Sequence, residues 1–176
     1  MKPIRQAQGK KDVLIYFDLI TSLKTTREVD DLSLEIDNLM FALFKSEKMS
    51  LEKALSSISS NSANRITEIF EKNNLDMIDK EQVSDFLDTL KDLIKKFKVI
   101  KLILAFDPTR ETIENIAEYV SENIGIGYIL DIEVSESILA GAVVMFNGKY
   151  KDFTLRKSLE ETFRDKREEI VSTLNS

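Results

Sequence analysis

The sequence predicts an α+β protein in which an N-terminal helical bundle, residues 1–96, precedes a small C-terminal α+β domain with a short mixed sheet, residues 97–176. Apolar residues recur with helical spacing through the first part, and near Phe97 the pattern changes to alternation and short apolar runs. The low content of 5 Gly and 2 Pro among 176 residues favours helices, and this length suits one domain or two small ones.

The first two helices are expected over residues 12–24 and 28–45. The first segment is strongly apolar and contains no Gly or Pro. The second has one apolar stripe with helical spacing, which predicts that one side of the helix faces a core. The stripe consists of Val29, Leu32, Ile36, Leu39, Met40, Leu43 and Phe44.

Three further helices complete the predicted bundle. Ser50 is expected to cap a short helix, because its hydroxyl can accept a hydrogen bond from a first-turn amide, and the serine-rich run 56–62 ends that helix. A fourth helix ends at the asparagine pair 73–74. Asp79 followed by Gln82 resembles a capping box at the start of a fifth, longer helix.

A strand, a helix and a second strand are expected to open the C-terminal domain. The nearly continuous apolar run 99–106 is typical of a strand covered on both faces. The helix that follows ends at Gly125, since glycine takes a left-handed conformation without steric cost. Residues 128–134 alternate between apolar and polar positions, which indicates a half-exposed strand.

A β-hairpin and a helix are expected to close the chain. The hairpin starts with a strand over 141–146, and Asn147-Gly148 is a strong signal for a two-residue turn. Thr154 can cap the last helix. The residues expected to point inward from it are Leu155, Leu159, Phe163 and Ile170.

The composition excludes several function classes. Without Cys there are no disulfides, thiolate nucleophiles or Cys-ligated metals, and without His the usual general base and the commonest metal ligand are missing. The net charge of -6 disfavours nucleic acid as a partner. Since no apolar stretch reaches the roughly 20 residues of a membrane span, association with a membrane is expected only through other subunits.

Two features resemble known sites only superficially. Residues 125–127, Gly-Ile-Gly, follow a helix and precede a strand, which reverses the order of a dinucleotide-binding loop, so a helix end and a turn explain them better. Asp131 and Glu133 share one strand face and could form a catalytic carboxylate pair, but an exposed sheet face accounts for them more simply.

Two charged clusters also have structural explanations. The acidic cluster lacks the glycine and the spacing of a calcium loop, and a run of lysines usually forms a solvated face. The acidic residues are Asp76, Asp79 and Glu81, and the lysines are Lys91, Lys95, Lys96, Lys98 and Lys101. The sequence therefore predicts no catalytic, cofactor-binding or metal-binding residue.

An ordered set of residues in the last third carries a family resemblance. The set runs through Ile138, Leu139, Ala140, Gly141, the strand to Phe146, Gly148, Asp152, Thr154 and Leu159. This pattern resembles the signature of the delta subunit of F-type ATP synthases, also called the oligomycin-sensitivity-conferring protein. Together with the preceding strand, the Asp-Pro-Thr break and the helix to Gly125, the resemblance covers about residues 83–165.

The resemblance implies a non-catalytic peripheral-stalk (stator) subunit, which acts during proton-driven ATP synthesis and has no cofactor. The helical domain would hold the N-terminal segment of the alpha subunit of the catalytic head, and the C-terminal domain would hold the end of the b subunit. The implied location is the cytoplasmic face of the bacterial plasma membrane, where the subunit would be attached through the complex.

The motif residues are expected to serve the scaffold. Gly141 allows a close backbone approach inside a strand, and Gly148 makes the turn. Asp152 and Thr154 start the last helix, and Leu159 packs against the domain.

The first helix is expected to have apolar surface left over for a partner. On a helical wheel its apolar residues span about 200°, whereas one side of a bundle needs about 100°. The residues assigned to a partner helix are Leu14, Ile15, Phe17 and Leu19. A central helix buried on all sides would explain the same pattern.

Three other functions remain open from the sequence. The E-type stator subunit of vacuolar and archaeal ATPases ends in a similar glycine-strand-turn-Thr-helix pattern, but it begins with one long coiled helix, which the breaks at 56–62 and 73–74 argue against. A generic helical adaptor and a hydrolase that relies on carboxylates alone are more distant alternatives.

Overall fold

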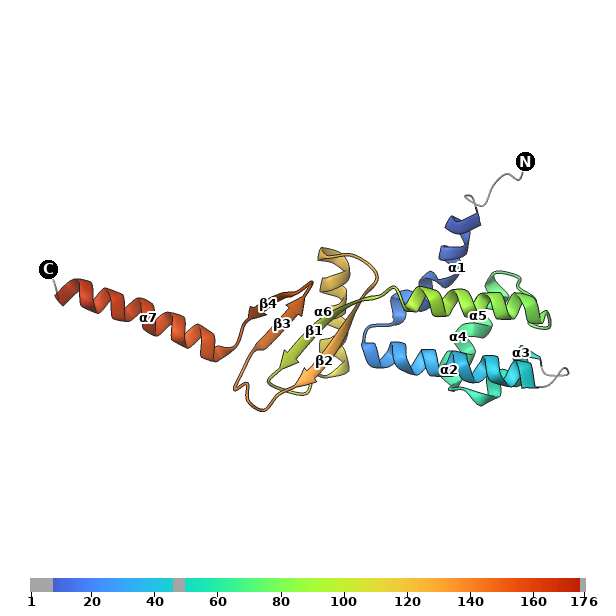
Figure 1. Cartoon of the computed structure of the whole chain (residues 1–176), viewed down its shortest axis with the longest axis horizontal. Helices are drawn as coiled ribbons and strands as arrows, with labels where there is room; N and C mark the ends of the chain where they lie inside the picture. The colour runs from blue at the N-terminus through green and yellow to red at the C-terminus, as the bar shows by residue number, and fades with distance from the viewer. Residues whose placement is uncertain (1–7, 46–49, 175–176) are drawn as a thin grey trace. The chain divides into compact units, whose positions relative to one another are not determined.

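The computed structural model describes residues 8–45 and 50–174, with side chains described for 15–45 and 50–167. Two compact units, Met1–Phe97 and Lys98–Ser176, divide the chain (Figure 1). In the described residues the first unit is built from helices, and the second contains a four-stranded mixed sheet with two helices. The predicted α+β fold class is therefore confirmed.

The helical unit is built from amphipathic segments whose apolar faces form one core. Its elements are α1 (Gln8–Ser22), α2 (Thr26–Lys45), α3 (Leu51–Ala54), the short 3-10 helix η1 (Leu55–Ser57), α4 (Ser60–Lys72) and α5 (Lys80–Ile94). In the core, the ring of Tyr16 stacks on Phe86 at 4.9 Å between centroids, and Phe70 meets Phe86 edge-on at 4.8 Å. These contacts join α1, α4 and α5, and such aromatic pairs stabilise beyond their buried area.

The starts of these helices show which local signals were informative. Asp79 accepts hydrogen bonds from the amides of Glu81 and Gln82, and the Gln82 side chain donates to Asp79 at 3.0 Å, so the predicted cap of α5 is present. Ser50 lies at the N-cap of α3, but the predicted hydroxyl bond is not formed. The expected inward orientation of Phe44 is also wrong, because its ring is exposed on α2.

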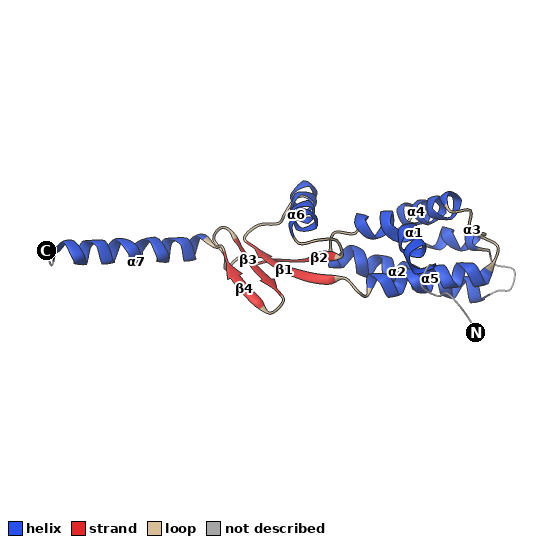
Figure 2. Cartoon of the chain, turned by 90° about the horizontal axis from the view of Figure 1, so that it is seen from above, coloured by secondary structure: helices blue, strands red, loops and turns tan. Residues whose placement is uncertain are grey.

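The C-terminal unit consists of one sheet, one helix packed on it and one terminal helix. The elements are β1 (Lys98–Leu104), α6 (Arg110–Asn123), β2 (Tyr128–Val134), β3 (Ala142–Phe146), β4 (Lys149–Asp152) and α7 (Leu155–Leu174). The strand order is β2-β1-β3-β4, with β1 parallel to β2 and the other two pairs antiparallel. Since parallel strands require a crossover, α6 connects β1 to β2 and covers one face (Figure 2).

The two faces of the sheet differ in how they are covered. The residues of the core beneath α6 are Ile100, Leu102, Leu104, Val120 and Leu130. On the opposite face Val99, Met145 and Tyr150 are exposed, whereas Ile129 and Val143 are buried. The prediction that the first strand is covered on both faces is therefore wrong at Val99, because a continuous apolar run shows that both faces are apolar and not what packs on them.

Among the described residues, no helix combines the length and the apolar composition that a membrane span requires.

Candidate partner-binding sites

The outer side of α1 is the first candidate surface. Leu19, assigned to a partner by the sequence, is only 3% exposed and belongs to the core of the helical unit. Ile15 is half-buried against the same core, whereas Phe17 is 41% exposed. Leu14 lies outside the residues whose side chains are described. Of the described residues in this set, Phe17 is the one whose side chain is well exposed.

The motif residues of the last third meet where the sheet passes into α7, a place we call the sheet-helix joint (residues 140–141 and 152–155). Gly141 adopts a φ of +94°, and a Cβ atom there would lie 2.3 Å from the carbonyl oxygen of Phe153 and 2.9 Å from the Cα of Thr154. Only glycine fits such a conformation and such a contact. Gly141 directly precedes β3, so it lies outside the strand in which the sequence placed it.

Hydrogen bonds complete the joint. The Leu155 amide donates to the carbonyl of Ala140 at 2.9 Å, and the Thr154 amide donates to Oδ1 of Asp152 at 2.8 Å. The Thr154 hydroxyl accepts from the Lys157 amide at 3.4 Å, which caps the first turn of α7. The joint therefore ties the start of α7 to the end of β4 and to the segment before β3.

The electrostatics of the joint follow from these bonds. The hydrogen bond from the Thr154 backbone, followed by the one from its side chain, lowers the pKa of Asp152 below its usual value. Both bonds favour the charged carboxylate, since a charged acceptor binds a donor more strongly than a neutral one. Asp152 thus acts as a local anchor at the start of the helix.

The hairpin beside the joint has the geometry that Asn-Gly favours. Asn147 and Gly148 have φ values of +49° and +71°, as a type I′ turn requires at both central positions. A Cβ atom at Gly148 would meet nothing within 4 Å. Gly148 is therefore needed only because its φ angle is positive. Gly141 is needed both for its positive φ angle and because the backbone of Phe153 and Thr154 leaves no room for a side chain.

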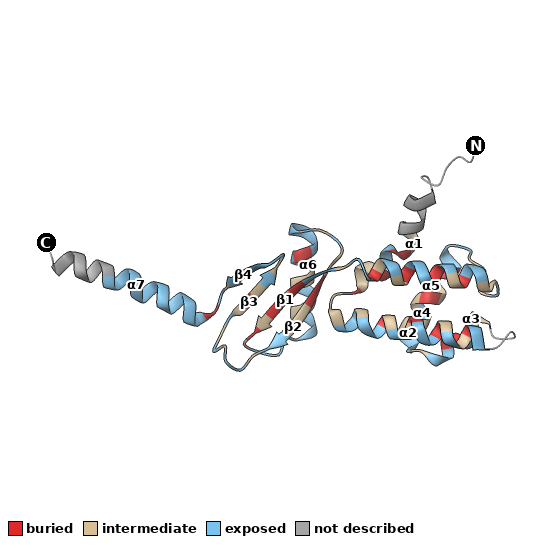
Figure 3. Ribbon diagram, viewed as in Figure 1, coloured by how far each residue is buried: buried red, intermediate tan, exposed pale blue. Residues whose placement is uncertain are grey.

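The terminal helix α7 is the second candidate surface. Its apolar residues Leu155, Leu159 and Phe163 are 46%, 45% and 68% exposed, so the prediction that they pack inward is wrong (Figure 3). The side chain of Ile170, also expected to point inward, lies outside the described ones. Helical periodicity identifies an apolar face, but it does not say whether this chain or another protein covers it.

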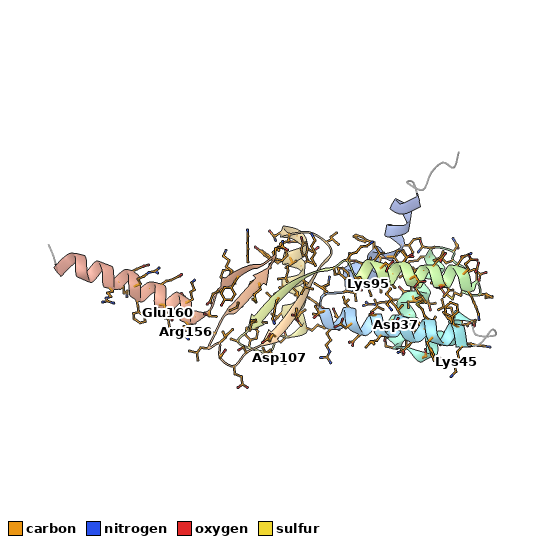
Figure 4. All side chains as sticks on the ribbon, in the orientation of Figure 1. Asp37, Lys45, Lys95, Asp107, Arg156 and Glu160 are labelled. Atoms are coloured by element: carbon orange, nitrogen blue, oxygen red, sulfur yellow. The ribbon has the colours of Figure 1, made fainter. Side chains whose placement is uncertain are left out.

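Ion pairs within α7 support its exposed turns. Arg156 Nε lies 3.0 Å from Glu160 Oε1, one turn further along the helix (Figure 4), and Lys157 Nζ lies 3.9 Å from Glu161 Oε1. Such pairs at i and i+4 stabilise a helix even without tertiary packing. The described turns of α7 thus have local support where their apolar residues have no cover.

Three of the carboxylates that could have formed a reactive pair or a metal site have structural partners. Glu133 forms an ion pair with Lys101 at 2.7 Å across β1 and β2, and this contact raises the pKa of Lys101. Asp76 accepts from the amide of Ile78, and Asp79 caps α5. Among the residues described, no three acidic side chains are grouped as a metal ion would require.

The lysine cluster and the glycine pair also have local roles. Lys91 forms an ion pair with Asp37, and Nζ of Lys95 lies 3.4 Å from Oδ1 of Asp92. The ammonium of Lys98 lies over the ring of Tyr128. Residues 125–127 form the end of α6 and a turn, with positive φ at both glycines.

Comparison with known proteins decides the family. A family model described as ATP synthase delta (OSCP) subunit matches residues 8–165. The chain belongs to this family. It is therefore a non-catalytic, peripheral-stalk (stator) subunit of F-type ATP synthase. The match also decides against the E-type stator subunit, the generic adaptor and the hydrolase.

Two solved structures of ATP synthases are also similar to this chain. One, from the Polytomella F-ATP synthase, is 16% identical with a TM-score of 0.39, and the match covers 44% of this chain and 99% of that chain. The other, from the Toxoplasma gondii mitochondrial ATP synthase hexamer, is 15% identical with a TM-score of 0.34, and the match covers 92% and 97%. No curated protein sequence matches the chain significantly.

The exposure of several apolar residues of this delta-family chain was not predicted from the sequence. Leu139 and Phe153 flank the joint and are exposed, and so are Leu34 and Phe41 on α2. For α2 the signal was present, since Leu34 and Phe41 fall outside the stripe of buried residues at helical spacing. For Leu139 and Phe153 no periodicity marks the exposure, because both lie in connecting segments.

Proposed function

We propose that the two units of this stator subunit bind different partners: the helical unit binds the N-terminal segment of the alpha subunit, and the C-terminal unit binds the end of the b subunit. The complex would act at the cytoplasmic face of a bacterial plasma membrane, with this chain attached only through other subunits. In this arrangement the chain links the catalytic head to the stalk and resists the torque of the rotor.

The observation that carries the proposal is the uncovered stripe of α7. Leu155, Leu159 and Phe163 expose apolar surface on a helix whose start is tied to the sheet by backbone hydrogen bonds. Burial of such a stripe by a partner helix is favourable by about 25 cal/mol per Å² of apolar area. A helix held at one end and apolar along one side suits a partner that is itself helical.

The support for the alpha-subunit site is smaller and comes from α1. Phe17 is exposed, and by helical spacing it lies on nearly the opposite side of α1 from Ile15 and Leu19, which pack on the core. A peptide helix that bound here would cover Phe17 on the side of α1 away from the core. We further propose that residues 1–96 and 97–176 are independently folding domains, which circular dichroism of the separate fragments would test.

The test is a pair of substitutions measured against both partners. Phe17→Ser should weaken binding of an alpha-subunit N-terminal peptide at least about tenfold and leave b-subunit binding unchanged, and Phe163→Ser should do the reverse. Each variant is the control for the other, since both replace an exposed phenylalanine on a helix. Calorimetric titration of the full chain would measure both affinities. Equal loss for both partners, or no loss for either, would contradict the two-site proposal.

A further inference from the structure

Asn147, in the turn between β3 and β4, is the one asparagine of the chain that a glycine directly follows. Asn147 and Gly148 are both exposed, and neither lies in a strand. Among the residues that the structure describes, the carboxamide of Asn147 forms no hydrogen bond and the backbone amide of Gly148 donates none. The two neighbouring groups are therefore free to react with each other.

The reaction open to this pair is an intramolecular displacement. The backbone nitrogen of Gly148 attacks Cγ of Asn147 and closes a cyclic imide, and the side-chain nitrogen leaves as ammonia with the proton that the Gly148 amide gives up. Water then opens the imide at either carbonyl carbon. Opening at Cγ gives aspartate, and opening at the backbone carbonyl gives isoaspartate, in which the chain runs through Cβ and Cγ. Because the two groups belong to adjacent residues, the entropic cost of bringing them together is low.

Asn74 is a matched position in the same chain. It is also exposed, and its φ of +51° is close to the +49° of Asn147. Leu75 follows it, however, and the Leu75 amide donates a hydrogen bond to the carbonyl of Phe70 at 2.9 Å. The nitrogen that would attack is thus held in place and carries a branched side chain beside it. Gly148 has no side chain, and even a Cβ atom there would meet nothing within 4 Å.

The position of the hairpin in the sheet also favours the reaction. β4 has four residues and is the outermost strand of the order β2-β1-β3-β4. Short edge strands open locally at a lower free energy than strands in a core. Opening of the turn allows rotation about ψ of Asn147, which brings the Gly148 nitrogen to Cγ.

We propose that Asn147 is a site of spontaneous deamidation, and that its isoaspartate product breaks the β3–β4 hairpin while its aspartate product keeps it. Aspartate fits the same turn, since Asp-Gly and Asn-Gly both form type I′ turns. Isoaspartate adds a carbon atom to the backbone of the turn and shifts the pairing of Phe146 with Lys149. The disturbance reaches the sheet-helix joint, because β4 ends at Asp152. The proposal does not depend on which partners the two units bind.

Incubation of the folded full chain in mildly alkaline buffer, followed by peptide mass mapping, measures the reaction at each asparagine. Conversion exchanges ammonia for water and raises the peptide mass by their difference, and electron-transfer fragmentation distinguishes isoaspartate from aspartate. Asn147 should convert at least about tenfold faster than Asn74. Equal rates at the two asparagines, or conversion of Asn147 only after urea has unfolded the chain, would overturn the proposal.

Two variants test the attacking group and the effect on the hairpin. Gly148→Ala places a methyl group beside the attacking nitrogen and should slow conversion of Asn147 at least about fivefold, and an unchanged rate would overturn the role of the Gly148 amide. Anion exchange separates the products from the parent chain, since each gains a negative charge. The isoaspartate fraction should melt at least about 2 °C below the parent, and the aspartate fraction should melt with the Asn147→Asp variant. An isoaspartate fraction that melts with the parent would overturn the loss of the hairpin.

Discussion

The helical unit and the C-terminal unit use their apolar residues differently. In the helical unit, α1, α2, α4 and α5 all contribute buried side chains to one core. In the C-terminal unit a smaller core lies between α6 and one sheet face, and the stripe of α7 stays exposed. Stability in the first unit therefore comes from packing, whereas α7 depends on its joint and on local ion pairs. The difference indicates which apolar residues serve folding and which are available for assembly.

The largest expected effect is the loss of a core side chain in the helical unit. Leu87 of α5 is fully buried, so Leu87→Ala should lower the free energy of unfolding by roughly 2–5 kcal/mol, because it removes apolar contacts and leaves a cavity. Leu159→Ala in α7 is the matched control and should change it by less than about 0.5 kcal/mol, since that side chain is exposed. Urea denaturation of both variants measures the contrast. Similar losses would mean that α7 packs on the protein after all.

The next effect concerns the two glycines near the hairpin. Gly141→Ala should lower the free energy of unfolding by roughly 2–4 kcal/mol, because the new methyl group meets the backbone of Phe153 and Thr154 and because the φ angle of residue 141 is positive. Gly148→Ala, which also has a positive φ but open space around it, should cost about 1 kcal/mol. Thermal unfolding of the two variants compares them. If their losses are equal, close approach at Gly141 contributes nothing.

A smaller effect is expected from the cap of α7. Thr154→Ala removes the side-chain acceptor of the Lys157 amide, and the loss of such a cap costs about 1 kcal/mol. Thr154→Ser keeps the hydroxyl and is the control. The loss should appear as reduced helicity of α7 by circular dichroism, and unchanged helicity in the alanine variant would argue against the cap.

The smallest effect is a pH dependence at the same joint. The hydrogen bonds from Thr154 lower the pKa of Asp152 in the folded protein. The contribution of this carboxylate to the free energy of unfolding is therefore fully present above the pKa of an unfolded aspartate, about 3.9. That contribution is lost as the pH falls through the lower pKa of the folded state. Asp152→Asn keeps the acceptor oxygen but cannot titrate. Acid titration of stability should therefore be less steep for this variant than for the parent chain. Superimposable acid curves would exclude a role for the carboxylate charge.

Local signals explain how much of the structure was predictable. Asn147-Gly148 and the cap at Asp79 depend on neighbouring residues, and the period of α2 is a property of one segment, so all three could be predicted. The exposure of Phe17 beside the buried Leu19 depends on how other helices pack, which sequence spacing does not contain. The contact between Gly141 and Phe153 depends on two segments that meet only in the folded sheet.

The partner sites show the same limit more sharply. The stripe of α7 was identified correctly as apolar, but it was assigned to the interior because helical spacing does not show whether the rest of the chain covers such a stripe. Its start at Thr154 was predictable because capping chemistry is local. The sheet-helix joint as a whole could not be predicted, because the backbone hydrogen bond from Leu155 to Ala140 joins two residues that no sequence motif relates.

Hydrogen exchange of the free chain and of the assembled ATP synthase tests most directly whether α7 is a surface for assembly. In the free chain the amides of α7 should exchange far faster than those of α2 and α5, because its described turns have no packed cover. In the complex the exchange of α7 should slow at least about tenfold, while that of α2 and α5 changes little. Exchange in α7 that is equally fast in both states, or already slow in the free chain, would contradict this account.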